Sequence, residues 1–195
     1  MRNAPEPAPD PNLLVSSSWR APGRSRREIA ARLRALGDPA PLVTPTDRKG
    51  VVAARTTLEP REVIRGLRAL HQVSPEVFRY TYKWVPVDLW SKPDLDSLRG
   101  AVEHVRDRIA PGERWRISVE RRTAGGPAVP EIIAALAALI AAPVDLSHPD
   151  KTLLIELFGA RAALAVLAPQ DTLTVVGGPR PGRRSAERRT PGEGR

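Results

Sequence analysis

The 195-residue sequence predicts an α+β protein built from two consecutive units. Apolar and polar residues alternate in some segments, as they do in strands. In other segments apolar residues recur every three or four positions, as they do in helices. The two kinds of segment follow one another in two series, with no long linker between the series. Hydrophobic residues make up 41% of the chain, which is enough for a packed core.

The first series covers residues 12–90 and begins and ends with a strand. Its segments are strand 12–19, helix 25–37, two short strands within 41–57, helix 60–71 and strand 78–90. Ser25 and Glu28 have the spacing of a capping box at the start of the first helix, and Gly37 is a typical helix end. The βαββαβ order is that of a ferredoxin-like unit.

The second series covers residues 91–176. It predicts helix 94–109, strand 114–122, helix 129–142 and a hairpin within 144–166 whose two strands join at Gly159. On strand 114–122, Trp115, Ile117 and Val119 alternate with polar residues, so one face of this strand is expected to be buried. Helix 129–142 is apolar nearly all round, which predicts a buried helix.

Both ends of the chain are expected to be disordered. Residues 1–11 form a proline-rich leader, and residues 177–195 form a basic tail that is poor in apolar residues. The net charge is +9, of which most lies between these ends, and this favours a polyanionic partner such as nucleic acid. Arginine outnumbers lysine 27 to 4, however, and codon bias in a GC-rich genome would also produce that excess.

Most enzymatic chemistries find no support in the composition. Cysteine is absent, which excludes disulfides, thiolate metal sites and a cysteine nucleophile. His71, His104 and His148 lack metal-ligand spacing, and no Gly-rich nucleotide loop or nucleophile elbow is present. The longest apolar run, 132–142, is too short to span a bilayer. We therefore expect a cytoplasmic protein without catalytic residues, metal or cofactor.

The hairpin segment carries a motif that points to a family. The motif is a Val-Asp-Leu, a short polar turn, a Pro-Asp and an apolar strand with a Glu, here Val144, Asp145, Leu146, Pro149, Asp150 and Glu156. With the preceding ferredoxin-like unit, it resembles the THUMP-domain proteins over residues 12–176, and among them the stand-alone adaptor of tRNA cytidine acetylation. The sequence departs from the adaptor pattern after residue 122, where Thr123 and the segment 125–127 stand in place of an expected Asn.

The motif itself has a structural explanation. Asp145 and Asp150 can cap backbone amides around the turn, and Pro149 makes the turn rigid. We therefore expect these three residues to be architectural and RNA contact to come from other residues.

Basic residues at strand edges are the candidates for RNA contact, because Arg can hold phosphate oxygens bidentately and Lys supplies a mobile point charge. They are Arg114, Arg116, Arg121 and Arg122 on or just after strand 114–122, Lys151 and Arg161 at the two ends of the first hairpin strand, and Arg79 and Lys83 among the aromatic residues of strand 78–90. A solvated charged face is the alternative for any single Arg. Packing between the units is the alternative to base stacking for Tyr80, Tyr82 and Trp84. The stretch of Trp19, Arg20 and residues 24–27, where a strand leads into a helix, is a further candidate phosphate site.

The resemblance implies a non-catalytic tRNA-binding protein that presents tRNA, gripped at its acceptor end, to a separate cytidine N4-acetyltransferase. Two alternatives stay open. One is the RNA-binding subunit of another two-chain enzyme that methylates or thiolates tRNA. The other is a small-ligand sensor, since ferredoxin-like units often serve that purpose and a fold alone does not determine function.

Overall fold

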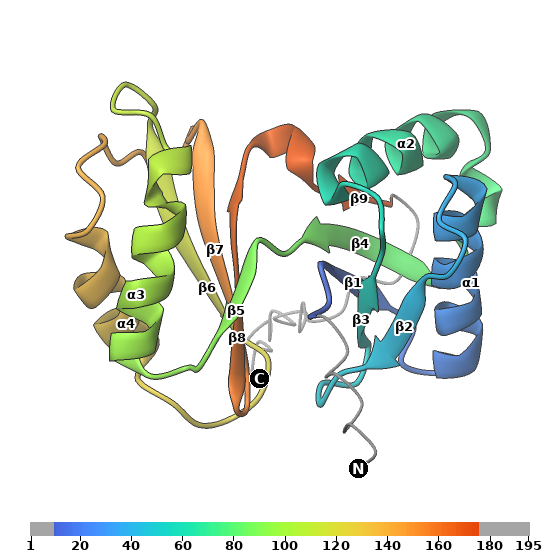
Figure 1. Cartoon of the computed structure of the whole chain (residues 1–195), viewed down its shortest axis with the longest axis horizontal. Coiled ribbons are helices and arrows are strands. Elements are labelled where there is room, and N and C mark those ends of the chain that lie inside the picture. The colour runs from blue at the N-terminus through green and yellow to red at the C-terminus, as the bar shows by residue number, and fades with distance from the viewer. Residues whose placement is uncertain (1–9, 176–195) are drawn as a thin grey trace, which may run out of the picture.

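Two β-sheets packed face to face form the centre of the molecule, and a pair of helices covers the outer face of each (Figure 1). This computed structural model describes residues 10–175. The strands are β1 (Leu13–Ser17), β2 (Leu42–Pro45), β3 (Val51–Arg55), β4 (Thr81–Pro86), β5 (Leu89–Ser91), β6 (Trp115–Arg121), β7 (Lys151–Phe158), β8 (Arg161–Leu167) and β9 (Leu173–Thr174). The helices are α1 (Pro22–Ala35), α2 (Pro60–Val73), α3 (Leu95–Val105) and α4 (Val129–Ala137), with short 3-10 turns η1 (Pro75–Val77), η2 (Arg106–Arg108) and η3 (Pro169–Asp171).

The first sheet has the strand order β2-β3-β1-β4-β9, and all of its pairs are antiparallel. Its first four strands and helices α1 and α2 have the βαββαβ order and the arrangement predicted for a ferredoxin-like unit. The fifth strand, β9, comes from the C-terminal end of the described chain and pairs with β4, placing Thr174 opposite Lys83. The second series of elements therefore returns to complete the first sheet.

Helix α1 begins three residues earlier than the sequence predicts, and the expected capping box is wrong. Pro22 occupies the first turn, where its missing N–H costs nothing. Ser25 is buried inside the helix and its hydroxyl donates to the carbonyls of Ser18 and Ala21. Glu28 does not reach back to a cap, because its carboxylate accepts hydrogen bonds from the backbone around Tyr80.

The predicted strand 78–90 is two strands in different sheets. The chain leaves the first sheet after Pro86 and enters the second at Leu89. In between, the Val87 amide donates to the Asn12 carbonyl and the Asp88 amide donates to the Leu164 carbonyl. The apolar run of residues 84–87 covers this crossing without a polar turn, which is why the sequence pattern reads as one strand.

The second sheet has the order β5-β8-β7-β6, in which β6 runs parallel to β7 and the other pairs are antiparallel. Trp115, Ile117 and Val119 pack toward helices α3 and α4, as predicted. Helix α4 differs from its prediction, because within Val129–Ala137 only Ile132 and Leu136 are buried. The other face of the helix contains alanines, which are small enough to be exposed at little cost. The apolar sequence of α4 therefore did not mean that every side of the helix is buried.

Asp10 and Pro11, the last two residues of the expected leader, are the first residues that the structure describes. The Asp10 carboxylate lies 2.6 Å from the Arg161 guanidinium, and the Pro11 carbonyl accepts a hydrogen bond from the Trp90 indole at 2.6 Å. Residues 1–9 and the basic tail 177–195 lie outside the described residues. Within residues 10–175, no helix has the length and apolar character needed to cross a membrane.

Candidate nucleic-acid interface

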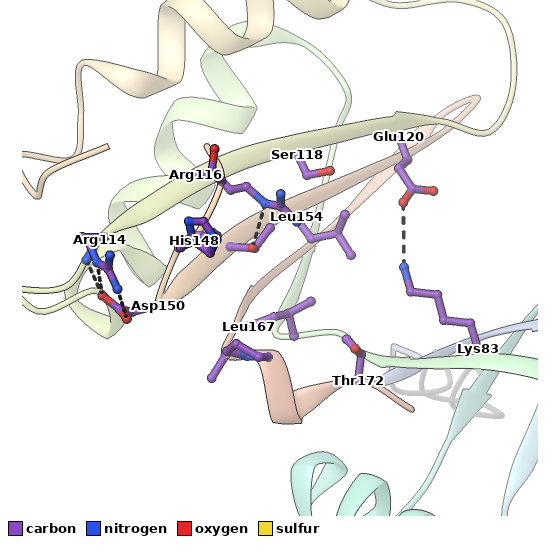
Figure 2. A pocket seen from close by; sticks show the side chains of 15 residues that line it. Lys83, Arg114, Arg116, Ser118, Glu120, His148, Asp150, Leu154, Leu167 and Thr172 are labelled. Atoms are coloured by element: carbon purple, nitrogen blue, oxygen red, sulfur yellow. Dashed lines mark hydrogen bonds and ion pairs between the residues drawn. The ribbon is translucent and has the colours of Figure 1, made fainter. Parts of the chain in front are cut away.

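A cleft of about 620 Å³ lies where the edge of the second sheet faces the first sheet (Figure 2). One wall consists of β6, β7 and the turn that precedes β7, and the other consists of β4 and the segment around η3. The side chains that point into it from β6 are Arg116, Ser118 and Glu120, which share one face because alternate residues of a strand point the same way, and Arg114, just before the strand, also lines the cleft. The predicted polar face of this strand therefore forms part of one wall of the cleft.

Carboxylates shape the turn at one end of the cleft. Asp145 Oδ1 accepts hydrogen bonds from the amides of Ser147 and His148 at 2.9 and 2.8 Å, and Asp150 Oδ2 accepts one from the Arg114 amide at 2.9 Å. The two amide hydrogen bonds hold the pKa of Asp145 below its usual value, and the bonds from Arg114 do the same for the pKa of Asp150. Asp145 thus accepts hydrogen bonds from amides of the turn itself, whereas Asp150 joins the turn to the residue that precedes β6.

The same two carboxylates also neutralise a candidate RNA-binding residue. The Arg114 guanidinium lies 3.3 Å from both Asp145 Oδ2 and Asp150 Oδ2, and the pKa of Arg114 is raised, chiefly by its hydrogen bond to Asp150. An arginine held between two carboxylates attracts a phosphate less strongly than a lone one does. Arg114 therefore contributes to the shape of the cleft more than to its positive charge.

Arg116 is the cleft arginine without an acidic partner among the described residues. Its Nε donates to Thr152 Oγ1 at 3.3 Å and its Nη1 donates to the Leu146 carbonyl at 3.3 Å. Both acceptors are neutral, and the side chain is exposed toward the cleft (Figure 2). A guanidinium has five N–H donors, and these two hydrogen bonds use only two of those of Arg116. The two bonds hold the side chain in place, and the remaining donors can bind a further acceptor.

The far end of the cleft contains a cluster of opposite charges. Glu120 and Glu156 are register partners on β6 and β7, and Arg122 neutralises both, with distances of 2.6 Å to Glu120 and 2.8 Å to Glu156. Glu156 is 3% exposed and Arg122 is 21% exposed. Burial opposes the charge on Arg122, but the hydrogen bond and charge of Glu156 outweigh it and raise the pKa of Arg122. Lys83 reaches Glu120 from the opposite wall at 3.9 Å.

Arg121 lies on the other face of β6, away from the cleft. Its guanidinium donates to the carbonyls of Gly125 and Pro127 and so fastens the loop that follows the strand. Gly125 and Gly126 have φ angles of +104° and +75°, a conformation that favours glycine. Thr123, the residue at the departure from the THUMP adaptor pattern, accepts a hydrogen bond from the amide of Gly159. The arginines predicted to act together are therefore separated.

The other predicted RNA-binding residues are dispersed. Lys151 lies 3.7 Å from Glu113, and Arg161 pairs with Asp10 and lies over the Trp90 ring. Arg79 Nε donates to the Glu76 carbonyl at 3.2 Å. RNA contact by any of these residues stays a prediction, but only Lys83 joins Arg114 and Arg116 in the cleft.

Sequence reasoning missed several residues of the cleft because they lie on other segments. Thr152 faces Arg116 as its register partner on β7, and Thr172 follows η3 on the opposite wall. Ser118 could have been found, because it shares the alternation of Arg116 along one strand. His148 was identified as a turn residue but not as a lining residue of the cleft.

The architecture defines a class: a ferredoxin-like unit followed by an α/β unit that contains a parallel strand pair and a hairpin. No family model and no curated protein matches the sequence. Among solved structures, the chain is similar to PH1313 from Pyrococcus horikoshii Ot3, with a TM-score of 0.62 and 16% identity over 86% of this chain and 56% of that one.

Two further solved structures are similar to this chain, and one of them contains RNA. TrmN from Thermus thermophilus has a TM-score of 0.54 and 17% identity, covering 83% of this chain and 45% of that one. A 4-thiouridine synthetase in complex with RNA and ATP has a TM-score of 0.55 and 14% identity, covering 85% of this chain and 42% of that one. The chain thus spans about half the length of the structures that it matches. At 14 to 17% identity, this likeness shows the fold alone.

Proposed function

We propose that this chain binds tRNA and presents it to a separate tRNA-modifying enzyme, without catalysing the modification itself. The observation that carries the proposal is Arg116, an arginine that is positioned by neutral acceptors and has no acidic partner among the described residues, in a cleft between two sheets. The fold around it is similar to that of a synthetase whose structure contains RNA.

The chemistry of the cleft fits a phosphate backbone. Arg116 can hold two phosphate oxygens at once, and the hydroxyls of Ser118, Thr152 and Thr172 offer neutral donors along the same cleft. The carboxylates of Asp145 and Asp150 are occupied by Arg114 and by backbone amides, so they are less free to repel an anion. The cleft therefore offers well-positioned hydrogen-bond donors for a phosphate but only a small net positive charge.

The partner enzyme is proposed from the sequence motif. The THUMP resemblance of residues 144–156 favours a cytidine N4-acetyltransferase, with the acceptor end of tRNA gripped by the second unit and the ferredoxin-like unit setting the distance to the modified base. The likeness to TrmN and to a 4-thiouridine synthetase supports a second candidate, a role as the RNA-binding part of a methylating or thiolating enzyme. Either role places the protein in the cytoplasm.

The purified chain is expected to bind tRNA with an affinity that falls as salt rises, and to modify nothing alone. Incubation with tRNA and acetyl-CoA, S-adenosylmethionine or ATP, followed by nucleoside mass spectrometry, tests the second statement. A modified nucleoside made by the pure chain would overturn the non-catalytic role. Absence of salt-dependent tRNA binding would overturn RNA binding and favour a small-ligand sensor.

Affinity capture from cell extract identifies the enzyme partner. The proposal predicts an RNA acetyltransferase among the captured proteins. Capture of a tRNA methyltransferase or a sulfur transferase instead would replace acetylation by the second candidate.

A further inference from the structure

The first unit has an exposed tryptophan that is not part of the cleft containing Arg116. Trp19 follows β1 and is 60% exposed, whereas Trp84 and Trp115 are almost completely buried. The Arg20 guanidinium lies 5.1 Å from the centre of its ring. A single exposed hydrophobic residue is common on protein surfaces, so its surroundings decide whether this one has a role.

Trp19 lies among basic residues from three segments. A Cβ atom built on Gly50 would lie 3.5 Å from Trp19 Cβ, so the backbone next to Lys49 runs close to Trp19. The Ser18 amide donates to the Tyr80 carbonyl, so the backbone of Tyr80, which follows Arg79 in sequence, lies next to the residue that precedes Trp19. Arg24 Nη1 donates to the Tyr80 hydroxyl at 3.0 Å. We call this surface, made of Trp19, Arg20, Arg24, Lys49, Arg79 and Tyr80, the Trp19 platform.

The platform has positive charge without acidic compensation. Among residues 10–175, the ion pairs involve none of Arg20, Arg24, Lys49 and Arg79. Asp47, on the same loop as Lys49, lies against the tip of the hairpin at Gly159. Most of the arginines and lysines predicted for RNA are, by contrast, paired with carboxylates. Like Arg116, the four cations of the platform therefore have no carboxylate partner among the described residues.

A buried carboxylate holds the platform in shape. Glu28, on helix α1, accepts hydrogen bonds from the amides of Arg79, Tyr80 and Thr81 at 2.9 to 3.2 Å, and from the Thr81 hydroxyl at 2.7 Å. The Glu28 carboxylate thus bonds to backbone amides and a hydroxyl, and forms no ion pair with an arginine among the described residues. These bonds also fix the backbone of Tyr80 before any ligand arrives, and this lowers the ordering cost of binding.

An exposed indole among uncompensated arginines suits single-stranded nucleic acid, because bases stack on aromatic rings while phosphates contact the cations. We propose that the Trp19 platform binds an unpaired stretch of RNA, with one base stacked on Trp19. Lys83, in the cleft, lies three residues beyond Tyr80, which corresponds to about 10 Å along strand β4. The platform and the cleft are therefore connected by a short stretch of one strand.

This inference deepens the proposed function, and its test uses the whole chain with short oligonucleotides. A single-stranded oligouridine of about ten nucleotides is expected to quench the fluorescence of Trp19 on binding. Trp19→Ala is expected to weaken its binding by about 5- to 150-fold, while the affinity for an RNA duplex of equal length changes little. Trp19→Phe, which keeps an aromatic ring, is expected to retain most of the affinity. Val73→Ala, which removes an 83%-exposed side chain at the end of α2, is the matched control and should bind like the wild type.

Three results would overturn the stacking role. One is wild-type affinity of Trp19→Ala for the oligouridine, and another is an equal loss for single-stranded and duplex RNA. A tryptophan emission that does not change on binding in the wild-type chain would overturn it without any variant. The cleft is tested separately with Arg116→Ala and tRNA, so failure of either site can be recognised independently of the other.

Discussion

Removal of the Arg122 side chain should destabilise the fold rather than only weaken RNA binding. Glu156 is 3% exposed in the wild-type chain, and in Arg122→Ala it loses its cation while it still faces Glu120 across the strand pair. Breaking a buried ion pair in this way typically costs about 3 to 5 kcal/mol. Arg122 is itself 21% exposed and Glu120 is 35% exposed, so we expect the lower end, about 3 kcal/mol.

For a chain of this length, a loss of about 3 kcal/mol lowers the melting temperature by about 6 to 12 °C. Circular dichroism melts measure this shift. Arg116→Ala is the matched control on the same strand and should melt within about 2 °C of the wild type, because the side chain is exposed and its acceptors are neutral.

The double variant Arg122→Met with Glu156→Leu separates charge pairing from packing. Replacing both partners by apolar residues of similar volume is often neutral or stabilising, so this variant should recover most of the lost stability. A melting temperature of Arg122→Ala within about 2 °C of the wild type would refute the reasoning. It would mean that the Glu156 carboxylate is solvated or protonated without cost.

Three further predictions concern the turn and the contact between the units. Asp145→Asn and Asp150→Asn each keep a side-chain oxygen that can accept amide hydrogen bonds, but remove one negative charge from beside Arg114. Each variant should therefore bind tRNA more tightly and with a steeper salt dependence. Binding titrations that match the wild type would contradict this. Carboxyl NMR titrations should place both midpoints below the usual value of about 3.9. Because the folded pKa values are lowered, the stability from these two groups is complete above about pH 4 and is lost as the pH falls through the folded values; midpoints at or above 3.9 would contradict the hydrogen bonds. Arg61→Ala should cost about 1 to 3 kcal/mol in urea unfolding, because Arg61 joins α2 to the buried Asp88 at 2.9 Å and to the Val166 carbonyl at the same distance; a loss below 0.5 kcal/mol would show that Arg108 alone suffices.

Periodicity was sufficient to predict most of the fold. The βαββαβ series and the hairpin joined at Gly159 depend on local alternation, and both are present. The crossing at Val87 and Asp88 and the return of β9 to the first sheet were not predictable, because they depend on which sheet supplies the partner strand. A pattern of side chains along one segment contains no information about that choice.

The candidate site could be predicted only in part for a related reason. Alternation along β6 correctly separated Arg116 from the helix-facing residues. It could not show that Arg114 meets Asp145 and Asp150, or that Arg122 meets Glu156, because each pair is more than 30 residues apart in sequence. Charge counted along a sequence overestimates the charge that a ligand meets, since tertiary contacts neutralise part of it.

The salt dependence of tRNA binding by Arg116→Ala tests the central claim most directly. The titration is made at several salt concentrations beside the wild type, with melts to confirm that the variant is folded. We predict weaker binding and a slope of log K against log salt that is flatter by about 0.7 to 0.9, the value for one lost phosphate contact. A folded Arg116→Ala variant with wild-type affinity and slope would contradict the claim that the cleft holds tRNA.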